Sequence, residues 1–450
     1  MGYTLFIIIG IVLFIILFLF LFFFRREFGV AKKKKKKKKE KDRTKILSNA
    51  NKKLSINPRD PEAISALAEL HFKEETWDKA YKFYSMLLDL VPLHPELNEF
   101  ELNLNYGMAA LKLNNYEEAY KGLMVAKNID SENFLVNFHL GQIEYQKQNF
   151  EKAYILLTHA QNAQPEHIQT NHLLGLSLYQ IKKYSEASVL LEKATEYEPD
   201  DKEALFCLAQ CYFELGNKEK SLMVFNHLRT DPKLGAKAAL MAGIISISQV
   251  KYGQAIMSFE IGLRHESIDP EIQAELLYRL ADAYFKKQDV ERALNLLLKI
   301  YNIKPNYKNV SELIVQYKEL SSNKNLQIYL ISPTSEFVTL CRKITMDFFS
   351  NARVKILDIT IIKNQYTDVL AEIDTKSWED LILFRFIRST GTVGELVLRE
   401  LHVRCKELRA GRGICIHAGD FSEGAKQFVE ARLIDLIKKK ELIKLFKRII

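Results

Sequence analysis

A ladder of small residues at a constant spacing of 34 constrains the fold of this chain more than any other feature. The rungs are Ala119, Ala153, Ala187, Ser221 and Ala255. Twelve residues before each rung stands a second small residue, in order Gly107, Gly141, Gly175, Ala209 and Gly243. The pairs Ala68/Ala80 and Ala281/Ala293 flank this run. A period of this length indicates a stack of supersecondary units, because each unit buries its apolar face only against its neighbours.

Each period predicts two antiparallel helices. Around Ala153, for example, the aromatic Phe150 precedes the rung by three positions and Leu157 follows it by four. Small residues on both helices let the two axes approach to roughly 8 Å. Proline then ends the second helix, because it lacks an N–H group and restricts the residue before it. These prolines are Pro92, Pro165, Pro199 and Pro305.

This pattern resembles the tetratricopeptide repeat (TPR), with about seven units across residues 60–308. The departures are serines in place of proline (Ser131 and Ser267), and Lys218 and Val290 in place of the aromatic. A helical bundle with chance periodicity is the alternative, but small, aromatic and proline positions recur in phase. The resemblance implies an all-α superhelix whose concave face binds protein segments.

The resemblance also implies which residues line the concave groove, namely Phe138, Gln142, Tyr145, His172, Tyr179, Phe206, Gln210 and Phe213. These side chains suit an apolar or aromatic peptide segment. The Lys/Asn clamp that some relatives use for a terminal carboxylate is absent. Packing between repeats is an open alternative for each aromatic residue. A metal-binding role for His172 is disfavoured, because no second ligand is suitably spaced.

An uncharged apolar run near the start of the chain predicts a membrane anchor. Residues 3–24 contain no charge and are long enough to cross a hydrocarbon core of ~30 Å. A secretory signal peptide is the alternative, but it requires a basic start and a small-residue cleavage site, and both are missing. We therefore expect residues 1–24 to be a retained single transmembrane helix.

A basic tract follows the anchor directly. It comprises Arg25, Arg26, Lys32, Lys33, Lys34, Lys35, Lys36, Lys37, Lys38 and Lys39. Because positively charged loops stay in the cytoplasm, the N-terminus is expected outside the inner membrane and the rest of the chain inside. The tract is placed to contact anionic lipid headgroups. A purely solvated spacer over residues 25–58 is the open alternative.

The same tract accounts for the basic character of the chain. The net charge is +9, and residues 46–450 are close to neutral. A nucleic-acid partner inferred from the overall charge is therefore disfavoured. The five cysteines form no C-x-x-C motif, and unpaired thiols suit a reducing cytoplasm.

The helical period fades after the repeats, which we expect to occupy residues 59–318. A polar stretch, 319–325, is expected to be a linker to an α/β domain over residues 326–450. Strands are predicted at 326–331, 354–362, 368–374, 380–387 and 413–419. Helices are predicted at 337–349, 394–408 and 422–433. Strand–helix alternation over this length is enough for one compact domain.

This region resembles Mrr-type restriction endonuclease-like domains. Two segments carry the resemblance. Residues 332–344 are similar to the family's opening helix, and residues 414–446 are similar to its closing strand, helix, last strand and last helix. Active members carry an Asp and then Glu/Gln-x-Lys on the next strand, which together hold and use Mg²⁺. Asp368 stands at the first position, but Phe384 and Phe386 replace the two later residues.

The resemblance therefore implies a nuclease-like fold that has lost catalysis and needs no cofactor. Glu372, Asp374 and Lys376 form E-x-D-x-K just downstream, and we expect them in a solvent-facing edge or hairpin. The predicted function is a membrane-anchored scaffold in the assembly of a bacterial membrane complex, of secretion, envelope or flagellar-motor type. The alternatives are a membrane-linked nucleic-acid-binding protein and a Mg²⁺-dependent nuclease that uses the C-terminal domain.

Overall fold

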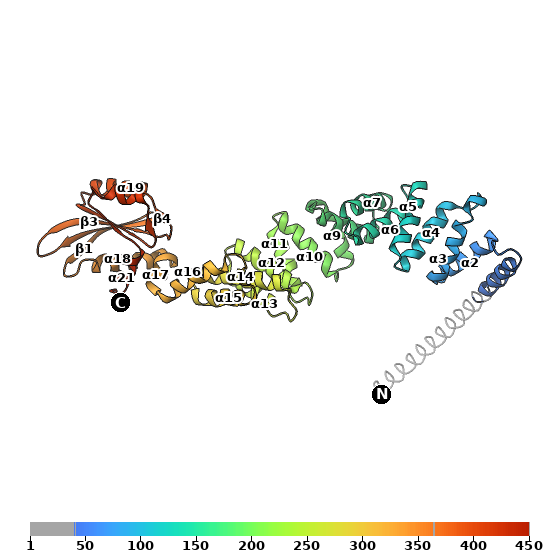
Figure 1. The fold of residues 1–450 in the computed structure, drawn as a ribbon, viewed down its shortest axis with the longest axis horizontal. Coiled ribbons are helices and arrows are strands. Elements are labelled where there is room, and N and C mark those ends of the chain that lie inside the picture. Colours follow the sequence, from blue (N-terminus) through green and yellow to red (C-terminus); the bar gives the residue numbers. More distant parts are fainter. Residues whose placement is uncertain (1–39, 41, 363–364, 450) are drawn as a thin grey trace, which may run out of the picture. The chain divides into compact units, whose positions relative to one another are not determined.

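The computed structural model describes residues 40, 42–362 and 365–449 (Figure 1). The predicted anchor and the lysine run at 32–39 lie outside these residues. The chain divides into two compact units, of which the first ends at Ser221 and the second begins at Leu222. Within the described part, none of the helices is both long and apolar enough to cross a membrane.

Antiparallel helix pairs build the first unit, as the ladder predicts. They are α2 (Pro61–Lys73) with α3 (Trp77–Leu88), α4 (Glu99–Lys112) with α5 (Tyr116–Ile129), α6 (Phe134–Gln146) with α7 (Phe150–Ala163), and α8 (Ile168–Gln180) with α9 (Tyr184–Tyr197), followed by α10 (Lys202–Glu214). A 3-10 turn, Val91–Leu93, separates α3 from α4. Asparagine or aspartate side chains cap several first helices, as Asn133 does for α6 by accepting from the Val136 N–H.

The steric reason for the ladder is visible at Gly141. A Cβ atom placed there would lie 2.6 Å from Cγ of Leu157 on the partner helix. Leu157 and the rung residue Ala153 are fully buried. Any larger side chain at Gly141 would therefore push α6 and α7 apart, which explains why the ladder pairs small residues twelve positions apart.

The C-terminal part of the expected spacer is folded. Residues 42–56 are helical, and Leu47 and Leu54 pack against a buried cluster that contains Ala63 and Leu67. Arg43 also forms an ion pair with Glu74, with 2.7 Å between Nε and Oε1. This helix covers apolar surface of the first repeat, in the manner of the terminal caps that repeat arrays need.

The second unit continues the helix pairs and ends in an α/β region. Its helices are the end of α11 (Lys218–Leu228), α12 (Gly235–Ser248), α13 (Tyr252–Gly262), α14 (Pro270–Lys286), α15 (Val290–Ile303), α16 (Val310–Ser322), α17 (Lys324–Ile331), α18 (Thr334–Asp347), α19 (Glu395–Glu407), α20 (Glu423–Val429) and α21 (Lys439–Phe446).

A mixed five-stranded sheet forms the centre of the α/β region, in the order β1-β2-β3-β5-β7. The strands are β1 (Arg353–Ile362), β2 (Tyr366–Asp374), β3 (Glu379–Ile387), β5 (Arg412–His417) and β7 (Ile434–Ile437). The first three run antiparallel, and β3, β5 and β7 run parallel. Helix α18 contacts β1 and β2, whereas α19 contacts β3 and β5. Figure 1 shows α18 and α19 on opposite sides of the sheet.

The short strands β4 (Thr392–Val393) and β6 (Asp420–Phe421) pair with each other at one side. The four predicted strands from residue 354 onward and the three predicted helices are all present, within a few residues of the expected bounds. The helix predicted at 422–433 is shorter, because α20 ends at Val429. Its N-cap is Ser422, which accepts a hydrogen bond from the Ala425 N–H.

The first strand predicted for this domain, 326–331, is wrong, because this segment is helix α17. Asn323 caps it by accepting from the Leu326 N–H, and Leu326 and Tyr329 point into the core at a helical spacing of three. The stretch 319–325 is not an open linker either. Residues 319–322 are the last turn of α16, and α17 begins at Lys324.

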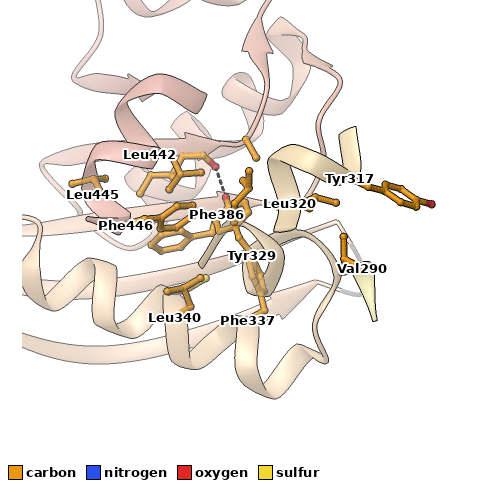
Figure 2. Packing of buried hydrophobic residues seen from close by; sticks show 14 of the residues in the cluster. Val290, Tyr317, Leu320, Tyr329, Phe337, Leu340, Phe386, Leu442, Leu445 and Phe446 are labelled. Carbon is orange, nitrogen blue, oxygen red and sulfur yellow. Dashed lines mark hydrogen bonds between the residues drawn. The ribbon is translucent and has the colours of Figure 1, made fainter. Parts of the chain in front are cut away.

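One continuous core joins the last repeat helices to the sheet. It contains Val290 of α15, Tyr317 of α16, Tyr329 of α17 and Phe386 of β3, and Figure 2 shows these side chains together with Phe446 of α21. The Tyr329 hydroxyl lies 3.1 Å from the Ile387 carbonyl and 3.0 Å from the Ile416 carbonyl. Helix α17 is thus the last helix of the array and also part of the α/β core.

Two polar contacts strengthen this joint. The Gln327 side chain donates to the Gln288 carbonyl at 2.9 Å, which links α17 to the end of α14. The Arg388 guanidinium, just after β3, donates to the carbonyls of Tyr329 and Leu330 at 3.1 and 3.2 Å. The Arg388 cation thus provides a donor for carbonyls at the C-terminal end of α17 and complements the dipole of this helix.

Candidate functional site

The predicted groove residues come from the first helices of three successive repeats in the first unit. Helix α6 carries Phe138, Gln142 and Tyr145, helix α8 carries His172 and Tyr179, and helix α10 carries Phe206, Gln210 and Phe213. All except Phe138 are partly exposed. The opposite faces of these helices are buried, for example at Leu140, Leu174 and Leu208.

The structure brings the groove residues of α8 and α10 together. The Tyr179 hydroxyl donates a hydrogen bond to Oε1 of Gln210. Nε2 of His172 lies 2.9 Å from Oδ2 of Asp201, the N-cap of α10, without the alignment of a hydrogen bond. His172 therefore contacts a neighbouring repeat.

Phe138 is a correction to the predicted groove, because its side chain lies in the core between repeats. It is 8% exposed. Its ring centroid lies 5.9 Å from that of Phe134 and 5.1 Å from those of His139 and His167. Because these rings cover the Phe138 side chain, a ligand in the predicted groove could not contact it. Phe138 instead packs in the core beneath the groove.

The groove presents uncharged aromatic and amide groups. Burial, with smaller effects from Glu203 and Cys207, raises the pKa of Tyr145 to about 12. Burial also raises the pKa of Tyr179 above its usual value. Both phenols are therefore neutral at physiological pH and offer a ring face, but the Tyr179 hydroxyl already donates to Gln210. Such a surface suits an extended segment with apolar side chains and free backbone groups.

A second series of residues at a spacing of 34, made of asparagines, was not predicted. Asn103, Asn137 and Asn171 are buried, each four residues before a glycine of the first ladder. The Asn137 amide donates to the Ser131 and Asn133 carbonyls at 2.7 and 3.0 Å. The Asn171 amide likewise donates to the Pro165 carbonyl at 3.0 Å. Asn137 and Asn171 thus close the loops that join repeats, whereas Asn103 donates to the Glu99 carbonyl of its own helix at 2.9 Å. The identical spacing of the three asparagines is a signal that the sequence contained.

In the α/β region, Asp368 of β2 is paired with Arg385 of β3. The two residues lie directly opposite each other in the antiparallel pairing of β2 and β3. Nε and one terminal nitrogen of Arg385 donate to the two carboxylate oxygens of Asp368 at 2.8 and 2.7 Å. The exposed fractions of the two side chains are 5% for Asp368 and 2% for Arg385. The Tyr366 ring covers the guanidinium at 3.8 Å.

This pair does not fit a magnesium site. Both oxygens of Asp368 already accept from Arg385, and a buried cation stands beside them. Burial lowers the pKa of Arg385, but the hydrogen bond and charge of Asp368 outweigh this and raise it overall, so the guanidinium stays charged. A divalent cation would have to displace an ideal bidentate partner and then lie beside its positive charge.

Phe384 and Phe386 lie on the other face of the sheet. Alternation along β3 places them opposite to Arg385, in the core beneath α18. Both are fully buried, and the Phe384 ring lies 5.4 Å from that of Phe348. The structure thus does not bring Asp368 together with the two motif positions. It separates them by the thickness of the sheet.

The downstream carboxylates occupy the end of the β2–β3 hairpin. Glu372 and Asp374 close β2, and Lys376 lies in the turn that follows. Nζ of Lys355 lies 3.5 Å from Oε2 of Glu372. A hydrogen bond with Glu372, and its negative charge, raise the pKa of Glu379. Asp374 and Lys376 are exposed, in keeping with the expected hairpin.

Comparison with known families supports both resemblances. The tetratricopeptide repeat family matches residues 274–307. The family of anaphase-promoting complex, cyclosome, subunit 3 matches residues 184–261. A restriction endonuclease family matches residues 351–446. The chain contains tetratricopeptide repeats. Its C-terminal α/β region is similar to restriction endonuclease domains.

Solved structures of repeat proteins also resemble this chain. YrrB, described as a TPR protein with an unusual peptide-binding site, is 18% identical over 44% of this chain and 98% of its own, with a TM-score of 0.36. A tetratricopeptide repeat protein from Parabacteroides merdae is 17% identical over 57% and 98%, with a TM-score of 0.34. Pseudomonas aeruginosa pilF is 17% identical over 50% and 97%, with a TM-score of 0.36. No curated protein sequence matches the chain.

Proposed function

We propose that this protein is a membrane-anchored scaffold whose repeat groove holds extended segments of partner proteins. The observation that carries the proposal is the row of partly exposed side chains on α6, α8 and α10, with buried residues behind it. The row offers Tyr145, Tyr179 and Phe213 as apolar contacts and Gln142 and Gln210 as amide donors and acceptors. Aromatic anchors of this kind dominate the energetics of protein interfaces.

The proposed location rests on the sequence of the first 39 residues. The uncharged run at 3–24 would span the inner membrane, and the lysines that follow would keep the rest of the chain in the cytoplasm. The helix at 42–56 begins directly after the lysine run and packs on the first repeat. The repeats would therefore start close to the membrane surface and serve the assembly of a bacterial membrane complex, of secretion, envelope or flagellar-motor type.

We further propose that the α/β region has no nuclease activity and serves as the folded end of the scaffold. The support is the Asp368–Arg385 pair, which uses the carboxylate that a metal would need. The core shared through α17 also ties this region to the repeats. A Mg²⁺-dependent nuclease remains the second candidate, because the family match covers residues 351–446.

A site-specific crosslinking experiment tests the groove. A photo-crosslinking amino acid at Gln142 in the full-length protein should capture the partner in membranes of the native host. The same amino acid at Ile155, which is 52% exposed on the second helix α7, should not. Partner capture should fall at least tenfold when Tyr145, Tyr179 and Phe213 are changed to alanine, because each buried aromatic contact contributes roughly 1–3 kcal/mol.

The matched control is Tyr197→Ala, which removes an aromatic ring that is 66% exposed at the end of α9. This variant should retain capture from position 142. Equal capture from positions 142 and 155, or full capture by the triple alanine variant, would contradict a role for the groove. Thermal unfolding of each variant shows whether a loss of capture reflects a loss of folding.

A further inference from the structure

A furrow along the exposed side of α18 contains cations that the scaffold function does not use. Two adjoining hollows lie there, with volumes of about 290 and 470 Å³. Both are lined by Thr339, Lys343 and Ile449, so they form one continuous depression, which we call the α18 furrow. Arg342, Met346 and Arg448 line its larger end.

The larger end of the α18 furrow carries three cations, Arg342, Lys343 and Arg448, and one carboxylate, Asp347. Arg342 and Lys343 are exposed on α18, and Arg448 reaches the furrow from the segment after α21. Throughout residues 42–362 and 365–449, none of these three cations belongs to an ion pair. The carboxylates of the furrow, Glu336 and Asp347, lie at opposite ends of α18. An anion in the larger hollow would therefore meet three cations and one carboxylate.

The neighbouring sequence adds to this charge. Exposed Lys440, Lys444 and Lys447 belong to the same C-terminal segment as Arg448, with Glu441 as its acidic residue. Lys439 is excluded from this set, because its Nζ lies 2.6 Å from Oε2 of Glu319. Among the residues that the structure describes, Lys440, Lys444 and Lys447 have no acidic partner in an ion pair, so they can attract an anionic surface.

Apolar side chains stand directly beside the cations. Met346 is 52% exposed, and Ile449 lies between the two hollows. Ile328 and Leu340 line the smaller hollow. Cations beside the exposed Met346 and the partly exposed Ile449 match a ligand that carries a phosphate head and a hydrocarbon portion. Nucleic acid fits less well, because its affinity requires many phosphate contacts along an extended track.

We propose that the α18 furrow binds the phosphate headgroup of an anionic phospholipid. Arg342, Lys343 and Arg448 would contact the phosphate, and Met346 and Ile449 would contact the first carbons of the lipid. This proposal rests on the proposed membrane location, because only there would such lipids be close. It gives the α/β region its own contact with the membrane, independent of both the anchor and the groove.

A soluble lipid separates this site from the anchor. The full-length protein is held in amphipol, without free micelles, and titrated with dihexanoyl phosphatidylglycerol below its micelle concentration. A dye on Ser335→Cys, at the rim of the smaller hollow, reports binding. Labelling at this position is selective, because the five native cysteines are buried. The labelled protein, with wild-type side chains at all other positions, should give a saturable signal with dihexanoyl phosphatidylglycerol. It should give no signal with dihexanoyl phosphatidylcholine.

The variant Arg342→Gln/Lys343→Gln should bind roughly 30-fold more weakly, since each basic residue near a lipid surface contributes a factor of about five. The control Lys376→Gln/Lys406→Gln removes two exposed cations of the same region that lie outside the furrow. It should bind within about twofold of the parent.

Three outcomes would overturn the proposal. The first is the absence of saturable binding in the parent protein. The second is equal affinity in the furrow variant and its control. The third is displacement of the lipid by inorganic phosphate at an equal concentration, which would assign the furrow to free phosphate compounds. Failure of the groove experiment leaves these results unaffected, because the readout involves neither α6 nor α8.

Discussion

At the scale of single residues, the proposed loss of catalysis in the α/β region rests on one substitution pattern. The sequence showed that Phe384 and Phe386 replace the metal-binding and lysine positions of the nuclease family. It gave no indication that Arg385, between them, pairs with Asp368. Since residues on a strand alternate between faces, the pair and the two phenylalanines lie on opposite sides of the sheet. The pair is structural, and its energetics are testable.

Removal of one partner of the Asp368–Arg385 pair should be strongly destabilising. Asp368→Leu leaves a buried guanidinium without its carboxylate, and we expect the free energy of unfolding to fall by about 3–5 kcal/mol. The double variant Asp368→Leu/Arg385→Met should recover most of this loss, because it removes the buried charge as well. Urea denaturation of the full-length protein measures both effects.

The same variants test the nuclease alternative. Purified parent protein with Mg²⁺ should leave plasmid DNA intact, and so should Asp368→Leu. DNA cleavage by the parent that disappears in the double variant Asp368→Leu/Arg385→Met, which keeps most of the stability, would restore Asp368 to a catalytic role. A nearly unchanged stability of Asp368→Leu would contradict the buried pair as described.

At the scale of elements, α17 has the greatest consequence for the architecture. Its mostly apolar residues 326–331 have a composition that suits a buried strand. Periodicity alone does not distinguish a buried strand from a buried helix in so short a segment. Its partners decide in favour of a helix. Its buried residues, Leu326 and Tyr329, lie in the single core that α15 and α16 share with the sheet. A segment that serves two neighbours cannot be a linker.

Tyr329 should be the most sensitive single position of this joint. Its hydroxyl bonds to the carbonyls at the ends of β3 and β5 from a fully buried site. Tyr329→Phe keeps the ring contacts with Phe337 and Phe446 but leaves those carbonyls without this donor. We expect a loss of roughly 1–2 kcal/mol. Hydrogen exchange should show it equally in α15 and β3.

The control for this joint is Tyr301→Phe, since Tyr301 is 44% exposed on α15. It should change stability by less than about 0.5 kcal/mol. If Tyr329→Phe increased exchange in β3 alone, the repeats and the sheet would unfold independently, and the shared core would not couple them.

At the scale of the whole molecule, the proposed scaffold depends on the orientation of the N-terminal anchor. A reporter that is active only in the cytoplasm, fused after residue 450, should be active in cells that express the full-length protein. Replacement of Lys32 to Lys39 by glutamine should reduce the fraction in this orientation, because these lysines dominate the positive charge beside the span. Activity confined to an exported reporter would place the groove on the other side of the membrane.

The sequence alone determined the repeat array, the helix pairs and most of the strands, because a fixed period and local hydrophobic patterning depend only on neighbours along the chain. Tertiary structure decided the remaining features. Phe138 is buried outside the predicted groove, because His167 of the next repeat packs against its ring. Residues 326–331 form a helix, and its Leu326 and Tyr329 are buried in the one core that the last repeat helices share with the sheet. Asp368 lost its metal-binding potential because Arg385 lies across the strand pair. Each depends on residues brought together from different elements, which periodicity does not encode.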